Sequence, residues 1–125
     1  MGLDIKVLVV DDSSTMRRIV KGVFKGLGFT NILEAEDGSG ALEKLRKEKI
    51  DLILADWSMP KMTGLDLLKT VRSDNNLKNI PFIMVTAEGQ KKDILEATRA
   101  GVSNYIVKPF TPETLSETIK RTLKE

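Results

Sequence analysis

Ile5-Lys6-Val7-Leu8-Val9-Val10 is a short apolar run rich in β-branched residues, and it stops at the acid pair Asp11-Asp12. An apolar run of this length, without polar alternation, is typical of a strand that is covered on both faces. The stretch therefore predicts a buried strand that ends in two carboxylates.

An amphipathic helix is predicted directly after this strand. Ser13 or Ser14 is its candidate N-cap, and Gly28 marks its end. Its apolar stripe follows helical spacing: Met16, Ile19, Val20, Val23, Phe24 and Leu27. We expect this stripe to pack on the sheet.

The same alternation of strand and helix repeats along the rest of the chain. Further strands are expected at 32–35, 52–55, 82–85 and 105–107, and further helices at about 38–48, 65–73, 94–98 and 112–123. Thr63 and Asp66 fit a capping box, Gly101 closes the fourth helix, and Thr111-Pro112 opens the fifth. Five βα units predict an α/β fold: a single, doubly wound parallel sheet with helices on both faces. Residues 1–125 are expected to form this one domain, with no room for an output domain.

Composition narrows the chemistry. The 125 residues suffice for one compact domain, and the sequence contains neither His nor Cys. Thiolate nucleophiles, Ser-His-Asp triads, His general bases and Cys/His zinc sites are therefore excluded. The chemistry that remains uses carboxylates, hydroxyls and amines.

Charge and hydropathy point away from nucleic acid and membranes. The formal net charge is only +2, and Arg17, Arg18 and Lys21 fall opposite the apolar stripe of their helix, which favours a solvated face. Apolar runs are too short for a membrane span, and the first residues do not resemble a signal peptide. We expect a cytoplasmic protein.

Polar residues follow four of the five expected strands. They are Asp11-Asp12 after the first, Asp56 after the third, Thr86 after the fourth and Lys108 after the fifth; Glu36-Asp37 after the second contributes less clearly. Each has a structural explanation when taken alone, such as a helix cap or a solvated charge. Because ligands collect at the carboxyl ends of parallel strands, their shared position instead predicts one site.

Three carboxylates in one crevice need a cation. A pair at 4 Å repels by on the order of 4 kcal/mol at an effective dielectric constant of 20, and Lys108 supplies only one positive charge. Oxygen ligands suit a hard divalent ion, and the small number of carboxylates favours Mg²⁺ over Ca²⁺. An ion beside an ammonium and a hydroxyl would cradle a phosphoryl group. We assign the nucleophile to Asp56, although spacing alone identifies the site and not the nucleophile.

Four ordered motifs resemble those of the receiver domain of two-component response regulators. They are Val9-Val10-Asp11-Asp12-Ser13, Asp56-Trp57-Ser58-Met59-Pro60 with Gly64, Val85-Thr86-Ala87, and Val107-Lys108-Pro109-Phe110. Ser13-Ser14-Thr15-Met16-Arg17-Arg18, Thr86-Ala87-Glu88 and Asn104-Tyr105 are similar to the stand-alone chemotaxis receivers, the CheY group. The resemblance implies the flavodoxin-like strand order 2-1-3-4-5.

The resemblance also implies residue roles. Asp56 would accept phosphate from a CheA-like histidine kinase, with Mg²⁺ held by Asp12, Asp56 and the Ser58 carbonyl and by Asp11 through water. Lys108 would pair with the phosphoryl group, and Thr86 would move toward it, drawing Tyr105 from an exposed to a buried rotamer. The face that would contact the kinase and a FliM-like flagellar motor switch protein comprises Lys91, Ile94, Thr98, Tyr105 and Val107. A monomer and a possible phosphatase partner are expected.

One departure from the family and several alternatives stay open. CheY proteins commonly carry Asn where this chain has Ser58, which leaves the lifetime of the phosphorylated state undetermined. A phosphorelay intermediate and a receiver cut from a transcription factor fit the same motifs. An aspartyl phosphatase would need Asp-x-Asp instead of Asp11-Asp12, and a flavodoxin would not place acids beside a flavin phosphate. We therefore expect a switch that is not a turnover enzyme.

Overall fold

Strands and helices alternate through residues 4–87 and 91–124, which are the residues that the computed structural model describes. The strands are β1 (Lys6–Val10), β2 (Asn31–Ala35), β3 (Leu52–Asp56), β4 (Phe82–Ala87) and β5 (Asn104–Lys108). The helices are α1 (Ser14–Gly26), α2 (Gly38–Lys47), α3 (Gly64–Ser73), α4 (Lys91–Arg99) and α5 (Pro112–Lys124). Glu88, which belongs to one of the quoted motifs, lies outside the described residues, as do the first three residues of the chain.

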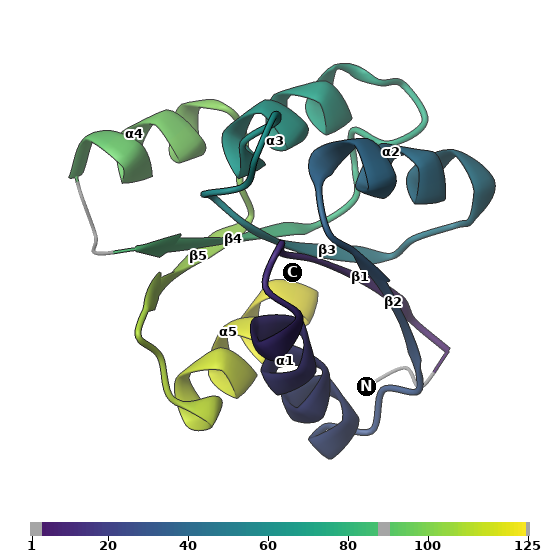
Figure 1. Cartoon of the computed structure of the whole chain (residues 1–125), viewed down its shortest axis with the longest axis vertical. Coiled ribbons are helices and arrows are strands. Elements are labelled where there is room, and N and C mark those ends of the chain that lie inside the picture. Colours follow the sequence, from purple (N-terminus) through teal and green to yellow (C-terminus); the bar gives the residue numbers. More distant parts are fainter. Residues whose placement is uncertain (1–3, 88–90, 125) are drawn as a thin grey trace.

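The strands form one parallel sheet in the order β2-β1-β3-β4-β5. Helices α1 and α5 cover one face, and α2, α3 and α4 cover the other (Figure 1). The expected doubly wound α/β fold and its strand order are thereby confirmed. Because β1 and β3 are neighbours at the centre, the loops that follow them meet at one rim of the sheet.

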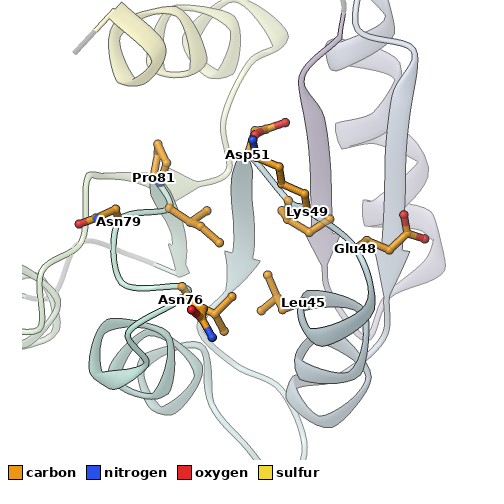
Figure 2. Close-up of a pocket in the computed structure, with 10 residues that line it drawn as sticks. Leu45, Glu48, Lys49, Asp51, Asn76, Asn79 and Pro81 are labelled. Carbon is orange, nitrogen blue, oxygen red and sulfur yellow. The ribbon is translucent and has the colours of Figure 1, made fainter.

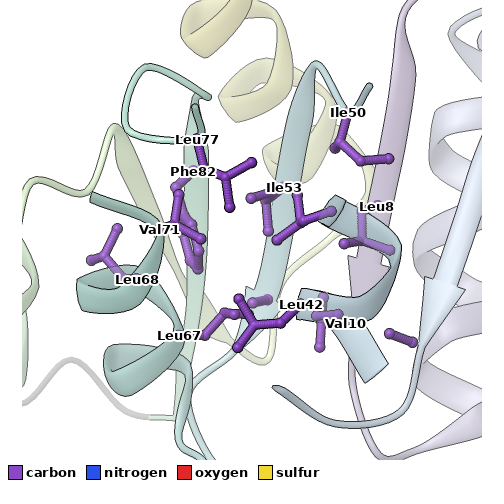
Figure 3. Packing of buried hydrophobic residues seen from close by; sticks show 14 of the residues in the cluster. Leu8, Val10, Leu42, Ile50, Ile53, Leu67, Leu68, Val71, Leu77 and Phe82 are labelled. Atoms are coloured by element: carbon purple, nitrogen blue, oxygen red, sulfur yellow. The ribbon is translucent and has the colours of Figure 1, made fainter. Parts of the chain in front are cut away.

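Alternation along each strand divides the interior into two cores. Leu8 and Val10 of β1 pack toward α2 and α3 (Figure 3), whereas Val7 and Val9 pack toward α1 and α5. All four side chains are fully buried. The apolar run of β1 therefore contributes side chains to both cores, which explains why it shows no polar alternation.

Helix starts follow the expected caps. Ser13, one of the two candidates, caps α1 by accepting from the Met16 amide at 3.1 Å. Thr63 and Asp66 form the complete capping box of α3, and Thr111 accepts from the Thr114 amide at 3.1 Å ahead of α5. Asp37 caps α2, so the acid that follows β2 has a structural task away from the main site.

Helix α1 departs from its expected pattern in two ways. Ile19, assigned to the buried stripe, is 47% exposed. Arg17 and Lys21, assigned to a solvated face, instead form ion pairs with Glu34 of β2 at 2.9 and 2.8 Å. The basic edge of α1 therefore faces the edge strand β2, and Ile19 lies outside the buried stripe, whose buried members are Val20 and Phe24.

A shallow groove lies at the amino ends of β3 and β4, opposite the rim that carries the acids (Figure 2). Its volume is about 330 Å³, and its lining mixes apolar, amide and oppositely charged side chains from the end of α2 and the segment before β4. Within the described residues, helices are too short and too polar to cross a bilayer.

Candidate functional site

Four adjacent strands deliver the expected site residues to one rim. Asp11 directly follows β1, Asp56 is the last residue of β3, Thr86 is the next-to-last residue of β4, and Lys108 is the last residue of β5. The register pairs Asp56 with Val85, and Thr86 with Val107. Residues that are separated by as many as 97 positions in the chain are therefore neighbours in space.

The three acids form a compact cluster. One carboxylate oxygen from each of Asp11, Asp12 and Asp56 lies within 4.8 Å of the other two. Asp11 and Asp56 are buried, whereas Asp12 is exposed. The Lys108 ammonium lies 2.7 Å from Asp56 Oδ1. Three carboxylates and one ammonium leave two negative charges, which one divalent cation would neutralise.

The donor set fits Mg²⁺. The cluster offers only hard oxygen ligands, and its open side at Asp12 leaves room for water and for a phosphate oxygen. The loop that would supply the Ser58 carbonyl follows Asp56 directly, and Ser58 itself is exposed. The residues present could therefore hold the ion that the sequence predicted.

Asp11 shows the electrostatic strain of this arrangement. Burial raises the pKa of its carboxyl group, and the negative charges of Asp56 and Asp12 raise it further. The Ser13 amide, which donates to Asp11 Oδ1 at 2.9 Å, and the Lys108 ammonium oppose that rise in pKa. A protein holds like charges this close mainly where a cation or a reaction needs them.

Thr86 carries a polar atom without a partner. Its side chain is 2% exposed, and among the described residues its hydroxyl makes no hydrogen bond. A buried hydroxyl left in this state costs about 1 to 3 kcal/mol. Thr86 lies at the carboxyl end of β4, between the strands that end in Asp56 and Lys108, and its hydroxyl is available to a ligand oxygen.

The loop after β3 is held close to the site by backbone contacts. The Trp57 amide donates to the Val85 carbonyl at 2.8 Å, and the Gly64 amide donates to the Trp57 carbonyl at 2.9 Å. A Cβ at Gly64 would clash with the Asp56 carbonyl oxygen. Glycine is therefore required at this position for the backbone of α3 to approach Asp56. Lys61 in the same loop has a positive φ of 70°.

The five residues expected to contact partners lie on α4 and β5. Lys91, Thr98 and Tyr105 are exposed, whereas Ile94 and Val107 are partly buried. The Tyr105 side chain is 39% exposed. The edge position of β5 in the sheet leaves this surface accessible.

Sequence reasoning missed an apolar cavity beside the site. Its volume is about 490 Å³, and its lining comprises Met16, Ile19, Ala87, Lys108, Pro109 and Phe110. Met16 and Ile19 line it from the α1 side. The available signal was Ile19, which lies at the edge of the apolar stripe of its helix. Helical spacing alone assigned this residue to the core, whereas in the structure it lines the cavity together with Pro109 and Phe110.

Comparison with known proteins gives a consistent result. The profile of the response regulator receiver domain matches residues 7–120. The chemotaxis protein CheY of Pseudomonas aeruginosa is 53% identical over 116 residues, which cover 93% of this chain and 94% of that protein. CheY-3 of Vibrio cholerae is 52% identical over 118 residues, covering 94% and 91% of the two chains.

Solved structures agree with these relatives. The chemotaxis response regulator CheY4 of Vibrio cholerae superposes with a TM-score of 0.88 at 38% identity, covering 94% of this chain and 98% of that chain. A response regulator structure from Chloroflexus aurantiacus gives a TM-score of 0.91 at 30% identity, covering 97% and 98%. The likeness thus extends over sequence, fold and nearly the full length of each chain.

Proposed function

This chain belongs to the response regulator receiver domain family, and from that membership we propose that it is a chemotaxis switch of a two-component system. Residues 1–125 act as one receiver domain, in the cytoplasm, as a signalling protein and not as a turnover enzyme. The observation that carries the proposal is the meeting of Asp11, Asp12, Asp56 and Lys108 at one rim. The chemotaxis relatives support the biological setting.

Asp56 accepts the phosphoryl group. A carboxylate oxygen of Asp56 attacks the phosphorus of a phosphohistidine on the kinase, the phosphorus–nitrogen bond breaks, and its electron pair stays on the imidazole nitrogen. The product is an aspartyl phosphate. Lys108, already 2.7 Å from the carboxylate, contacts the oxygens on which charge accumulates.

Mg²⁺ is the cofactor, and when bound it neutralises charge on the carboxylates and on the incoming phosphoryl group. Asp12, Asp56 and the Ser58 carbonyl would hold the ion directly, and Asp11 would hold it through water. This proposal is supported by the oxygen-only donor set and by its excess of two negative charges. The approach of the donor is open, because Asp12 and Ser58 are exposed.

Thr86 passes the change to the partner surface. Its unpartnered hydroxyl turns toward the phosphoryl oxygens and draws Tyr105, which is exposed in this structure, to a buried rotamer. The altered surface, made of Lys91, Ile94, Thr98, Tyr105 and Val107, binds the kinase and the flagellar motor switch protein with different affinities. A coupling of about 1 to 3 kcal/mol changes such an affinity by roughly 5- to 150-fold.

The chemistry is tested by mass spectrometry with acetyl phosphate and Mg²⁺. Wild-type protein is expected to gain one phosphoryl mass, and Asp56→Asn to gain none, because the amide is not a nucleophile under these conditions. Asp51→Asn, at the opposite end of β3, is the matched control and should label like wild type. Equal labelling of Asp56→Asn and wild type would show that the nucleophile is misassigned.

The switch is tested with Thr86→Ala. This variant is expected to accept phosphate on Asp56 but to lose the phosphorylation-dependent gain in affinity for a motor-switch peptide, because alanine offers no hydroxyl to the phosphoryl oxygens. Binding is measured by calorimetry before and after phosphorylation. A normal gain in affinity would remove Thr86 from the signalling route.

A further inference from the structure

Arg17 makes a contact that the phosphoryl chemistry above does not use. Its guanidinium donates through Nη1 to the backbone carbonyl oxygen of Asp11 at 2.7 Å and through Nε to Glu34 Oε1 at 2.9 Å. The Arg17 side chain is only 15% exposed. A shielded guanidinium is thus held between an edge strand and the peptide that joins the two acids Asp11 and Asp12.

Asp11 is fixed at three of its atoms. Its amide donates to the Ala35 carbonyl at 3.1 Å, its Oδ1 accepts from the Ser13 amide at 2.9 Å, and its carbonyl oxygen accepts from Arg17. Because a peptide unit is planar, fixing the Asp11 oxygen also fixes the nitrogen and the Cα atom of Asp12. Arg17 therefore restrains the position from which the Asp12 side chain leaves the backbone.

Asp12 needs such a restraint more than its neighbours do. Asp11 and Asp56 are buried and cannot turn away from each other, whereas Asp12 is exposed and lies within reach of two like charges. Repulsion favours conformations that carry Asp12 toward solvent. Keeping its backbone in place limits that escape and lowers the cost of ordering the ligand when an ion binds.

We propose that Arg17, anchored by Glu34, is a positioning residue that holds the Asp11-Asp12 peptide in the geometry required for Mg²⁺ binding. The inference rests on the proposed function, since it concerns the affinity of the same acid cluster. Arg17 reaches Asp11 through the peptide oxygen, to which its Nη1 donates at 2.7 Å. Its action is geometric.

The geometry requires arginine in particular. Two donors of one planar guanidinium point at once to the Glu34 carboxylate and to the Asp11 carbonyl. A lysine at this position keeps the charge but offers a single nitrogen. Lys21 provides the matched control within the same cluster, because it pairs with Glu34 at 2.8 Å from the next turn of α1.

The test measures Mg²⁺ binding by isothermal titration calorimetry on the unphosphorylated full chain. We expect the dissociation constant to rise about 10-fold in both Arg17→Gln and Arg17→Lys, which is the lower end of what the loss of an outer partner costs a metal site. Lys21→Gln should bind Mg²⁺ like the wild-type chain. In both Arg17 variants, phosphorylation by acetyl phosphate should be slower than in the wild-type chain at low Mg²⁺ and should reach the wild-type rate at saturating Mg²⁺.

Each outcome decides something. Wild-type affinity in Arg17→Gln, or an equal loss of affinity in Lys21→Gln, overturns the inference and leaves the proposed function standing. If the wild-type chain binds no Mg²⁺, the proposed function fails and the inference fails with it. Should Arg17→Gln not fold, as judged by circular dichroism, Glu34→Ala takes its place. It removes the oxygen that accepts from Arg17 Nε, and unchanged Mg²⁺ affinity in that variant counts against the inference.

Discussion

At the scale of single residues, the site combines charges that oppose folding with charges that bind a ligand. Asp11 is the clearest case, because burial and two neighbouring carboxylates raise its pKa. An ionised group in that position destabilises the folded state. The same charge attracts a cation, so the residue lowers the stability of the metal-free fold and favours metal binding.

Replacing Asp11 by Asn is therefore expected to stabilise the metal-free protein. We predict that Asp11→Asn raises the free energy of unfolding at pH 7 by about 1 to 2 kcal/mol, because a single carboxylate pair at such a separation repels by on the order of 3 kcal/mol and Lys108 offsets part of this. Urea unfolding in the presence of a chelator measures the change. A destabilised Asp11→Asn would mean that the bond from the Ser13 amide outweighs the repulsion.

The pH dependence of this difference has a definite sign. A carboxyl group whose pKa is higher in the folded state binds protons more readily there, so the folded state loses stability as pH rises through the interval between the unfolded and folded pKa values. The advantage of Asp11→Asn should be largest above the raised pKa of Asp11. It should disappear as pH falls below the ordinary value of an Asp carboxyl group.

At the scale of secondary structure elements, the approach of α3 to β3 positions Asp56, the proposed nucleophile. Gly64 begins α3 and donates to the Trp57 carbonyl, and a Cβ there would also lie 2.8 Å from Met84 Sδ. Because the nearest atom is the backbone carbonyl oxygen of Asp56, a side chain at position 64 could not be accommodated by a simple rotamer change. The loop between Asp56 and α3 therefore depends on this glycine.

Two glycine substitutions test this contact. Gly64→Ala is expected to lower the free energy of unfolding by about 1 to 3 kcal/mol and to slow labelling of Asp56, because the added methyl group overpacks against the Asp56 carbonyl. Gly22→Ala, on the open face of α1, should instead stabilise by about 0.5 to 1 kcal/mol through helix propensity. Thermal unfolding and mass spectrometry measure both variants. Equal behaviour of the two would refute the contact argument.

Helix α1 shows where sequence patterns reach their limit. Its cap, its end and its buried residues Val20 and Phe24 followed from spacing, because these depend on the chain nearby. The outward position of Ile19 and the pairing of Arg17 and Lys21 with Glu34 did not. They depend on how far α1 rotates over β2, a tertiary contact that no local pattern encodes.

At the scale of the whole molecule, the position of the rim site was predictable because it follows from the topology of a parallel sheet. Parallel strands end at a common edge, so polar residues at strand ends meet there whatever their separation in the chain. The order of the strands, by contrast, came from resemblance, since the apolar runs of β1, β3 and β4 are too alike to be ranked by pattern. The buried Thr118 and Thr122 of α5 were likewise missed, because each satisfies its hydroxyl locally on the preceding turn.

Metal binding at this rim should stabilise the entire fold. The proposed ligands lie at the carboxyl ends of β1 and β3, two neighbouring inner strands, so an ion that binds only the folded chain shifts the global unfolding equilibrium. At 100 times its dissociation constant Mg²⁺ contributes about 2.7 kcal/mol, which corresponds to a rise in Tm of about 10 °C for a domain of this size. Differential scanning calorimetry with Mg²⁺, against NaCl of equal ionic strength, measures this shift. Asp12→Asn should lose most of this rise in Tm, since it removes a proposed direct ligand that is exposed and lies outside the core. An equal rise in Asp12→Asn and wild type would show that the stabilising ion binds elsewhere on the protein.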